Sequence, residues 1–199
     1  ACLFAAAACQ RGERVLYVSL EEAAPTVVRA MAGLSIDLAG HLDDGALELH
    51  TVIPESRGIE EHLLAILQRI EALEPRHIVV DAISACQRMG SRESAFDFCV
   101  RLLTACRQKG ITCLFLNQVG DPADIMRITG MKISSLVDTL VAMSYRDDGT
   151  RLSRRLLVVK SRGGPHSMAY HDFALTDSGV EFRDPPEGRD APDGKGPRP

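Results

Sequence analysis

Apolar residues in this chain gather into short continuous runs that alternate with longer amphipathic segments. Three runs are almost uninterrupted: RVLYVSLEE (14–22), HIVVDAIS (77–84) and TCLFLNQ (112–118). ALELHTV (46–52) is a shorter strand candidate. Runs of this length without polar alternation indicate strands buried on both faces, as in a parallel sheet.

The segments between these runs have the 3.6-residue period of an amphipathic helix. Residues 58–73 and 91–108 show this period, and each segment is followed by a helix-breaking proline or glycine. Residues 1–10 have the composition of the later part of a helix. Because strands and helices alternate with short connections, we expect an α/β fold with a mostly parallel sheet and helices on both faces. Ligands of such sheets bind at the carboxyl ends of the strands.

The pattern changes after residue 136 to short strands joined by polar turns such as DDG (147–149) and DSG (177–179), which predicts hairpins that extend the sheet. The strand candidates are LVDTLVAMSY (136–145), RRLLVVKSRGG (154–164), SMAYHDFALT (167–176) and GVEF (179–182). Five of the ten prolines fall in residues 185–199, which have no apolar periodicity. We therefore expect one domain over residues 1–184 and a disordered Pro/Gly-rich tail over residues 185–199.

Composition restricts the function classes. The 199 residues are 45% apolar and 25% charged, with a net charge of -4, which is typical of a soluble globular protein. This balance argues against a nucleic-acid footprint or a membrane surface as partner, and no apolar run approaches the roughly 18 residues that span a bilayer. We expect a cytoplasmic protein.

The six cysteines form no CxxC pair, and no histidine lies near them at zinc-ligand spacing. Cys99 and Cys106 are seven residues apart on one predicted helix face. We interpret them as buried, reduced thiols that act as small apolar residues.

Acidic side chains end two of the buried runs. Asp81 closes the run IVVD in the form of a Walker B strand, whose carboxylate holds a magnesium ion directly or through water. Glu21 and Glu22 end a neighbouring run, where a carboxylate can polarise a water or hydroxyl as a general base. Both patterns have a structural alternative: Asp81 as a turn or helix cap, and the two glutamates as the start of a helix before Pro25.

Amide and cationic groups follow other strand candidates. Asn117 and Gln118 end the third run with amides that can orient a phosphate oxygen or a water. Lys160 and Arg162 occupy alternate positions at a strand end, hence one side of it, which suits a clamp on a polyphosphate within the chain or in a neighbour. The alternative for the two cations is a solvated hairpin end.

A serine pair, Ser134 and Ser135, lies in the mostly apolar stretch ITGMKISSLVDTL (128–140), five residues after Thr129. Taken alone, these hydroxyls fit a helix cap or a strand boundary. The phosphate-loop pattern GxxxxGK[ST] is absent from the sequence. Because a helix normally follows that loop and residue 1 already lies in a predicted helix, we expect the chain to begin just after its own loop.

Over residues 3–183, the ordered motifs resemble the KaiC family of circadian clock proteins, and specifically its second, C-terminal RecA-like ATPase domain. ERVLYVSLEE resembles the family's strand with catalytic glutamates, and PESRGIEEHL (54–63) is similar to a segment before its next helix. HIVVDAIS resembles the Walker B strand, ITCLFLNQ the sensor strand, and VVKSRGG the K-x-R-G segment that reaches the neighbouring subunit's nucleotide.

The same resemblance gives the serine pair a role. ITGMKISSLVDTL is similar to the segment in which that domain phosphorylates itself on adjacent Ser and Thr residues, which implies phosphorylation of Ser134 and Ser135, with Thr129 as a nearby acceptor. Ser135 keeps a hydroxyl where the family often has threonine, whereas Gly130 and Met131 replace polar residues.

The resemblance implies a RecA-like P-loop NTPase core in a hexameric ring, with ATP and Mg²⁺ bound between subunits and clock or signalling proteins as partners. Glu21 or Glu22 would be the general base, and Asp81 would serve the Mg²⁺ site. Asn117, Lys160 and Arg162 would bind the nucleotide, the two cations by stabilising charge on the transferring phosphoryl group. Arg88 would pair with the phosphorylated residue through charge-assisted hydrogen bonds.

Two other functions use the same residues. A RecA- or RadA-like DNA-dependent ATPase would share the sheet, but only Arg127 and Lys132 are basic between Asn117 and Leu136, which argues against DNA binding. A non-catalytic signalling or assembly module would explain the missing phosphate loop.

Overall fold

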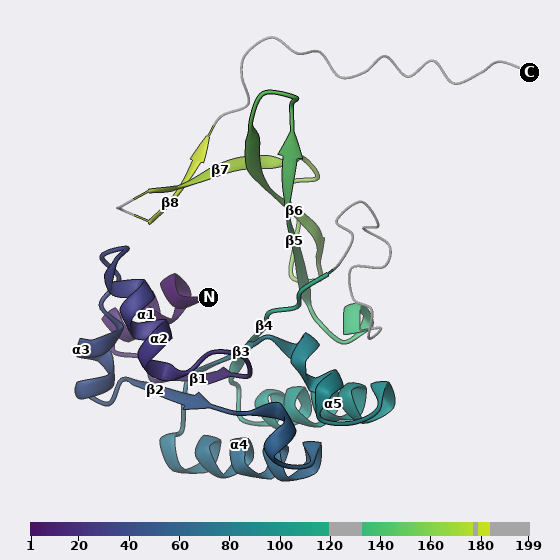
Figure 1. The fold of residues 1–199 in the computed structure, drawn as a ribbon. Coiled ribbons are helices and arrows are strands. Elements are labelled where there is room, and N and C mark those ends of the chain that lie inside the picture. Colours follow the sequence, from purple (N-terminus) through teal and green to yellow (C-terminus); the bar gives the residue numbers. More distant parts are fainter. Residues whose placement is uncertain (120–132, 177–178, 184–199) are drawn as a thin grey trace, which may run out of the picture. The chain divides into compact units, whose positions relative to one another are not determined.

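A computed structural model gives the structure of residues 1–119, 133–176 and 179–183. The chain divides into two compact units, Ala1–Asp138 and Thr139–Thr176, with short C-terminal segments assigned to each. Each unit contains a four-stranded sheet (Figure 1). The domain boundaries expected from the sequence, 1–184 and 185–199, stay predictions, and the tail lies outside the described residues.

The first unit is built on a parallel sheet in the order β2-β1-β3-β4. Its elements, in chain order, are α1 (Cys2–Gln10), β1 (Val15–Ser19), α2 (Ala24–Ala32), α3 (Leu38–Asp43), β2 (Leu47–Thr51), the 3-10 turn η1 (Pro54–Ser56), α4 (Ile59–Leu73), β3 (His77–Asp81), the 3-10 turn η2 (Ile83–Arg88), α5 (Arg92–Gln108), β4 (Thr112–Phe115) and the 3-10 turn η4 (Ile133–Ser135). The predicted α/β class and parallel sheet are confirmed.

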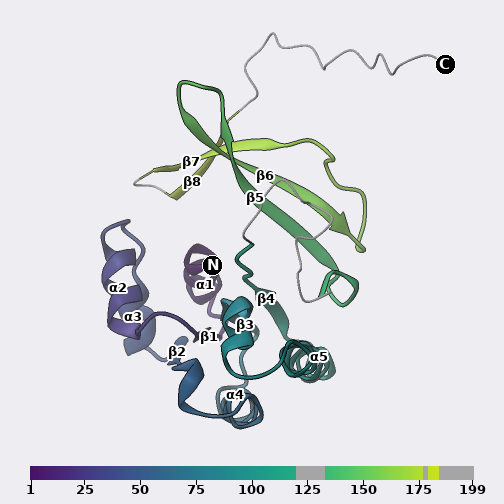
Figure 2. The ribbon, with the colours of Figure 1, turned by 45° about the vertical axis from the view of Figure 1, so that its right-hand side comes forward.

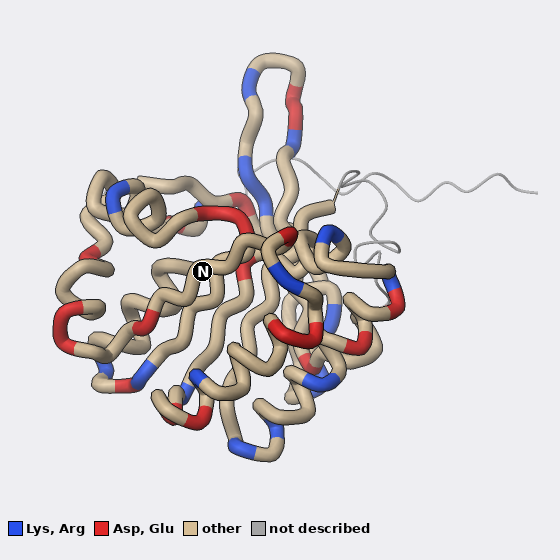
Figure 3. The backbone as a smooth tube through the Cα atoms, turned by 60° about the horizontal axis from the view of Figure 1, so that its bottom comes forward, with Lys and Arg blue, Asp and Glu red and all other residues tan. Residues whose placement is uncertain are grey.

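The apolar core of this unit has two layers, one on each face of the sheet, because successive strand residues point to opposite faces. The layer beneath α4 and α5 includes Leu16, Val18, Ile78 and Val80. The layer beneath α1, α2 and α3 includes Val15, Tyr17 and Val79. Figures 1 and 2 show α4 and α5 on one side of the strands and α1, α2 and α3 on the other, so the expectation of helices on both faces is confirmed. Figure 3 shows few charged residues along the strands of the parallel sheet and many on the helices and loops around it.

Local signals explain where the helices begin and end. Ser91 caps α5, since its hydroxyl accepts a hydrogen bond of 3.1 Å from the backbone N–H of Ser94. α1 ends before Gly12, which adopts a positive φ of 77°. α3 was not anticipated from the sequence, because its six residues are too few to show a period. It is capped by Asp37, whose carboxylate accepts from the N–H of Gly40 at 2.8 Å.

The observed strands are shorter than the apolar runs that predicted them. The run 77–84 forms a strand only as far as Asp81 and then continues as η2, and the run 112–118 is a strand only as far as Phe115. The run 14–22 likewise ends as a strand at Ser19. Asp81 is therefore the last residue of its strand, whereas the polar ends of the other two runs lie in loops at the carboxyl edge of the sheet.

The second unit is an antiparallel sheet in the order β5-β6-β7-β8. Its strands are β5 (Thr139–Asp147), β6 (Leu152–Ser161), β7 (His171–Thr176) and β8 (Gly179–Arg183). The predicted strands are present, but they pair with one another as a separate sheet rather than extending the parallel sheet. Across residues 1–119, 133–176 and 179–183, every helix is too short or too polar to cross a lipid bilayer.

Candidate active site

The polar ends of three strands meet at the carboxyl edge of the parallel sheet. Ser19 and Asp81 are partners in the register of β1 and β3, and the N–H of Leu20 donates to the carbonyl of Asp81 at 2.7 Å. The N–H of Leu116 donates to the carbonyl of Val80 at 3.0 Å. These bonds bring together the residues that follow β1, β3 and β4.

Asp81 is held by a tyrosine on the neighbouring strand. The Tyr17 hydroxyl donates a 2.6 Å hydrogen bond to Asp81 Oδ2. Tyr17 is 2% exposed, and burial, together with the bond to Asp81, raises the pKa of its hydroxyl. Because the hydroxyl therefore keeps its proton, it acts as the donor and the half-buried Asp81 as the acceptor.

The first turn of α1 reaches the same place. The thiol of Cys2 donates to the Tyr17 hydroxyl at 3.7 Å, so the helix begins beside the Tyr17–Asp81 pair.

Glu21 follows β1 at the same edge of the sheet, and two side chains hold its carboxylate. Arg88 Nη1 donates to its Oε1 at 3.2 Å, and Gln118 Nε2 donates to its Oε2 at 3.1 Å. Arg88 Nε also donates to Oε1 of Glu55 at 3.0 Å. The bond to Glu21 raises the pKa of the Arg88 guanidinium, with Glu55 adding to the effect, so the arginine stays charged between two carboxylates. We call Glu21, Arg88, Gln118 and Glu55 the edge cluster.

Glu22 is fixed through its backbone instead. The Ser19 hydroxyl donates to the Glu22 carbonyl at 2.7 Å and accepts from the Glu22 N–H at 3.1 Å, which closes a tight turn after β1. Within the part of the chain that the structure describes, the Glu22 carboxylate has no hydrogen-bond or ion-pair partner. Both glutamates are exposed, but they differ in their contacts: the Glu21 carboxylate is held by two donors, whereas Glu22 is fixed by its backbone.

Asp81 suits the magnesium ion that accompanies a polyphosphate. It offers carboxylate oxygen, the kind of ligand that Mg²⁺ prefers, and its bond to Tyr17 uses only Oδ2. The chemistry of this carboxylate therefore fits a cation at the carboxyl edge of the sheet.

The serine pair lies elsewhere in the first unit. Ser134 and Ser135 belong to η4, which is anchored by the buried side chain of Ile133. Arg107, in the last turn of α5, donates to the carbonyl of Leu136 just after the pair. Ser134 is half-buried and Ser135 is exposed. Thr129, the third predicted acceptor, lies outside the described residues.

The remaining predicted site residues fall into two groups. Asn117 follows β4 at the same edge as Asp81, next to Gln118 of the edge cluster. Lys160 lies in β6 and pairs in register with Leu140, and Arg162 follows that strand; both belong to the second unit. Their nucleotide-binding role stays a prediction.

The six cysteines are free thiols, and four of them are buried. These four are Cys9, Cys86, Cys99 and Cys106. The prediction for Cys99 and Cys106 is confirmed. Among the side chains that the structure describes, no group of histidine, cysteine and acidic residues forms a metal cluster.

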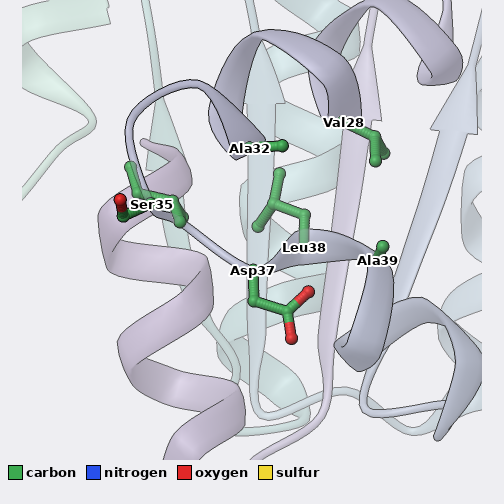
Figure 4. Close-up of a pocket in the computed structure, with 7 residues that line it drawn as sticks. Val28, Ala32, Ser35, Asp37, Leu38 and Ala39 are labelled. Carbon is green, nitrogen blue, oxygen red and sulfur yellow. The ribbon is translucent and has the colours of Figure 1, made fainter.

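A cavity of about 250 Å³ lies between α2 and α3 and shares no residue with the edge cluster (Figure 4). Its lining is mostly apolar: Val28, Ala32, Ser35, Ile36, Asp37, Leu38 and Ala39. The one charged residue, Asp37, uses its carboxylate to cap α3. The cavity is therefore a gap between packed helices rather than part of the acidic edge.

The doubly covered parallel sheet with acidic residues at its carboxyl edge defines a RecA-like α/β domain. A family model described as "ATPase: KaiC" matches residues 1–187, and the chain belongs to this family. The resemblance seen in the motifs is thereby confirmed.

Individual relatives agree with this assignment. The chain is 30% identical over 176 residues to the circadian clock oscillator protein KaiC of Thermostichus vulcanus, which covers 88% of this chain and 34% of the relative. It is 29% identical over 177 residues to the protein of that name from Synechococcus elongatus, covering 89% of this chain and 34% of the relative. The chain therefore spans about a third of the length of the curated relatives it matches.

Sequence reasoning missed two residues of this edge. Tyr17 lies inside the apolar run 14–22, and the available signal is that a tyrosine in a buried strand needs a partner for its hydroxyl. Glu55 was noticed only within the PES segment, because its bond to Arg88 joins residues 33 positions apart. Arg88 was expected to pair with a phosphorylated residue, and the structure pairs it with Glu21 and Glu55.

Proposed function

We propose that this domain binds ATP with Mg²⁺ and acts as a KaiC-type serine/threonine autokinase and ATPase. The observation that carries the proposal is the convergence of Glu21, Asp81 and Gln118, from three separate strand ends, on the carboxyl edge of the sheet. Phosphoryl transfer requires mainly positioning and charge stabilisation, and this edge offers oriented polar groups for both.

The roles follow from the chemistry of each group. Asp81 would hold Mg²⁺, with the Tyr17 hydroxyl fixing its carboxylate. A free lone pair on Glu21 would take the proton from a serine hydroxyl or a water as that oxygen bonds to the γ-phosphorus and ADP leaves. Mg²⁺, when bound, neutralises charge on the phosphate oxygens. Asn117, Lys160 and Arg162 would contact the nucleotide, the two cations from a neighbouring copy.

The position of the serines favours transfer between copies. Arg88 lies just before α5, whereas the serine pair is tied to the last turn of α5 through Arg107. The helix has 17 residues, and at about 1.5 Å per residue its ends are about 25 Å apart. A chain's own Glu21 is therefore poorly placed for its own Ser134 and Ser135. A hexameric ring, in which each copy faces the next, would bring them together.

The relatives are named circadian clock oscillator proteins. We propose by analogy that clock or signalling proteins interact with this domain and respond to its phosphorylation.

Mapping of phosphate by mass spectrometry tests the kinase. The protein as encoded by its gene is incubated with Mg²⁺ and ATP, and phosphate is expected on Ser134 or Ser135. The double variant S134A/S135A should lose that phosphate, whereas T104A, which removes an exposed hydroxyl from α5, should keep it. A wild-type protein with no phosphate on Ser134, Ser135 or Thr129 would overturn the autokinase assignment.

A further inference from the structure

We infer that Glu55 is a positioning residue for Glu21 and acts through Arg88. The inference deepens the proposed function, because it concerns the group proposed as the general base. Glu55 touches neither the serines nor Asp81 in the contacts above. Its effect on the chemistry would be indirect.

The geometry is a chain of three charge-assisted or polar hydrogen bonds. Glu55 Oε1 accepts from Arg88 Nε at 3.0 Å, and Arg88 Nη1 donates to Glu21 Oε1 at 3.2 Å. Gln118 Nε2 holds the other oxygen, Glu21 Oε2, at 3.1 Å. With one donor on each oxygen, the plane of the Glu21 carboxylate is fixed. A base in a fixed plane presents its remaining lone pairs in one direction.

The backbones that carry Glu55 and Arg88 are themselves secured. Glu55 lies in η1 next to the buried Pro54, whose carbonyl is 3.2 Å from Nε2 of the buried His62. Arg88 ends η2, in which Ala85 and Cys86 are fully buried. The turns η1 and η2 pack against each other. Only the side chains of this cluster can therefore change conformation. The hydrogen bond to the Glu55 carboxylate holds the Arg88 side chain in one conformation.

The side chains of this cluster are partly exposed, so their ion pairs orient one another more than they stabilise the fold. The side chains of Arg88, Glu21 and Glu55 are 46%, 29% and 59% exposed. Ion pairs this close to water contribute little to the free energy of folding, because solvent screens them. These ion pairs contribute orientation instead. The guanidinium is planar, and two of its N–H groups each hold one carboxylate in a defined direction. Loss of Glu55 would leave Arg88 tethered to Glu21 alone and free to rotate with it.

The same geometry bears on the role expected of Arg88. Its Nε and Nη1 are already committed to two carboxylates in this structure. A phosphate group would have to displace one of them or use Nη2. Glu55 therefore also competes with any phosphorylated residue for this arginine.

Steady-state ATP hydrolysis by the protein as encoded by its gene tests the inference. E55Q, which keeps the shape of the side chain and removes its charge, should lower kcat about 5–50-fold while KM changes less than about twofold. In the R88Q variant, adding E55Q should lower kcat by less than about twofold, because the link from Glu55 to Glu21 through Arg88 is already lost. E55D, which keeps the charge on a shorter stem, should recover part of the loss. The matched control is E60Q, which breaks the exposed Arg101–Glu60 pair and should leave kcat unchanged.

A crystal structure of E55Q without nucleotide gives a readout that does not depend on activity. Glu21 is expected to turn with Arg88 and lose its contact with Gln118, and to keep that contact in E60Q. Unchanged Glu21 contacts in E55Q, or effects of E55Q and R88Q on kcat that simply multiply, would overturn the positioning role. If the wild-type protein hydrolyses no ATP, the proposed function fails, and the E55Q structure still decides whether Glu55 orients Glu21.

Discussion

The hydroxyl of Tyr17 in β1 donates a 2.6 Å hydrogen bond to Asp81 at the end of β3. This bond joins polar side chains of two neighbouring strands of the parallel sheet. It links the fold to the site, because Tyr17 is packed in the core beneath α1 while Asp81 is a proposed ligand of Mg²⁺.

Replacement of Tyr17 by phenylalanine tests the strength of that bond. Y17F removes the donor and leaves Asp81 Oδ2 without its partner, so the free energy of unfolding should fall by about 1.5–3 kcal/mol. Urea denaturation followed by far-ultraviolet circular dichroism measures the change. The control is Y145F, because Tyr145 is 61% exposed on β5 and should change stability by less than about 0.5 kcal/mol. Equal effects of the two substitutions would contradict a structural role for the Tyr17 hydroxyl.

Helix α4 offers a comparison between its buried and exposed faces. Ile66 is 0% exposed against the sheet, and I66A should lower the free energy of unfolding by about 2–5 kcal/mol, since it leaves a cavity. Leu64 lies on the same helix but is 58% exposed, and L64A should cost less than about 1 kcal/mol. Chemical denaturation of both variants measures the free energy of unfolding. A larger decrease in L64A than in I66A would mean that the helix packs against the sheet by another face.

The thiols should differ sharply in reactivity. Burial raises the pKa of Cys86 to about 12 and also raises that of Cys99, so neither forms the reactive thiolate near neutral pH. In a pulse of iodoacetamide, read by mass spectrometry, these two should be alkylated only after unfolding in urea. Cys2 is partly exposed and should react first in the folded protein. Alkylation of Cys86 as fast as Cys2 without denaturant would contradict the packing described above.

The hairpin turn between β5 and β6 should respond to acid. The Asp148 carboxylate accepts from the Thr150 hydroxyl and from the N–H groups of Thr150 and Arg151, which lowers its pKa from 3.8 to about 2. Because the folded pKa is the lower one, the contribution to stability is complete above about pH 3.8 and is lost as the pH falls through about 2. The carboxyl carbon shift of Asp148, followed by NMR against pH, should have its midpoint near 2.

A substitution in the turn separates the causes of that shift. T150V removes the hydroxyl donor, the largest of the causes, and the midpoint should rise towards 3.8. T139V, at the start of β5, should leave it unchanged. An Asp148 midpoint at 3.8 in the wild-type protein would show that the turn is not closed by this carboxylate.

The long helices and buried strands of the first unit could be predicted because each carries its signal in consecutive residues. The helix at 91–108 has an apolar period, a serine cap and a terminal glycine, and the observed α5 begins at Arg92 and ends at Gln108. α3 is six residues long and depends on a cap by Asp37, so periodicity had too little to detect. The strand ends were overestimated because apolar residues continue into η2 and the loops.

The acidic edge was only partly predictable for a related reason. Asp81 and Glu21 were found because a carboxylate at the end of an apolar run is visible in the sequence. The bond from Arg88 to Glu55, and that from Gln118 to Glu21, join residues 33 and 97 positions apart and exist only once the strands are aligned. Tyr17 was hidden inside an apolar run, where its hydroxyl has no local partner.

We propose the carboxyl edge of the parallel sheet as the catalytic site, with Glu21 as its base. The decisive measurement is the rate of Mg²⁺-dependent phosphate release from ATP, on the protein as encoded by its gene, for the wild type, E21Q and the control E60Q. We expect E21Q to release phosphate at least about 100-fold more slowly than the wild type, at unchanged nucleotide affinity, and E60Q to match the wild type. Release by E21Q at the wild-type rate would contradict it.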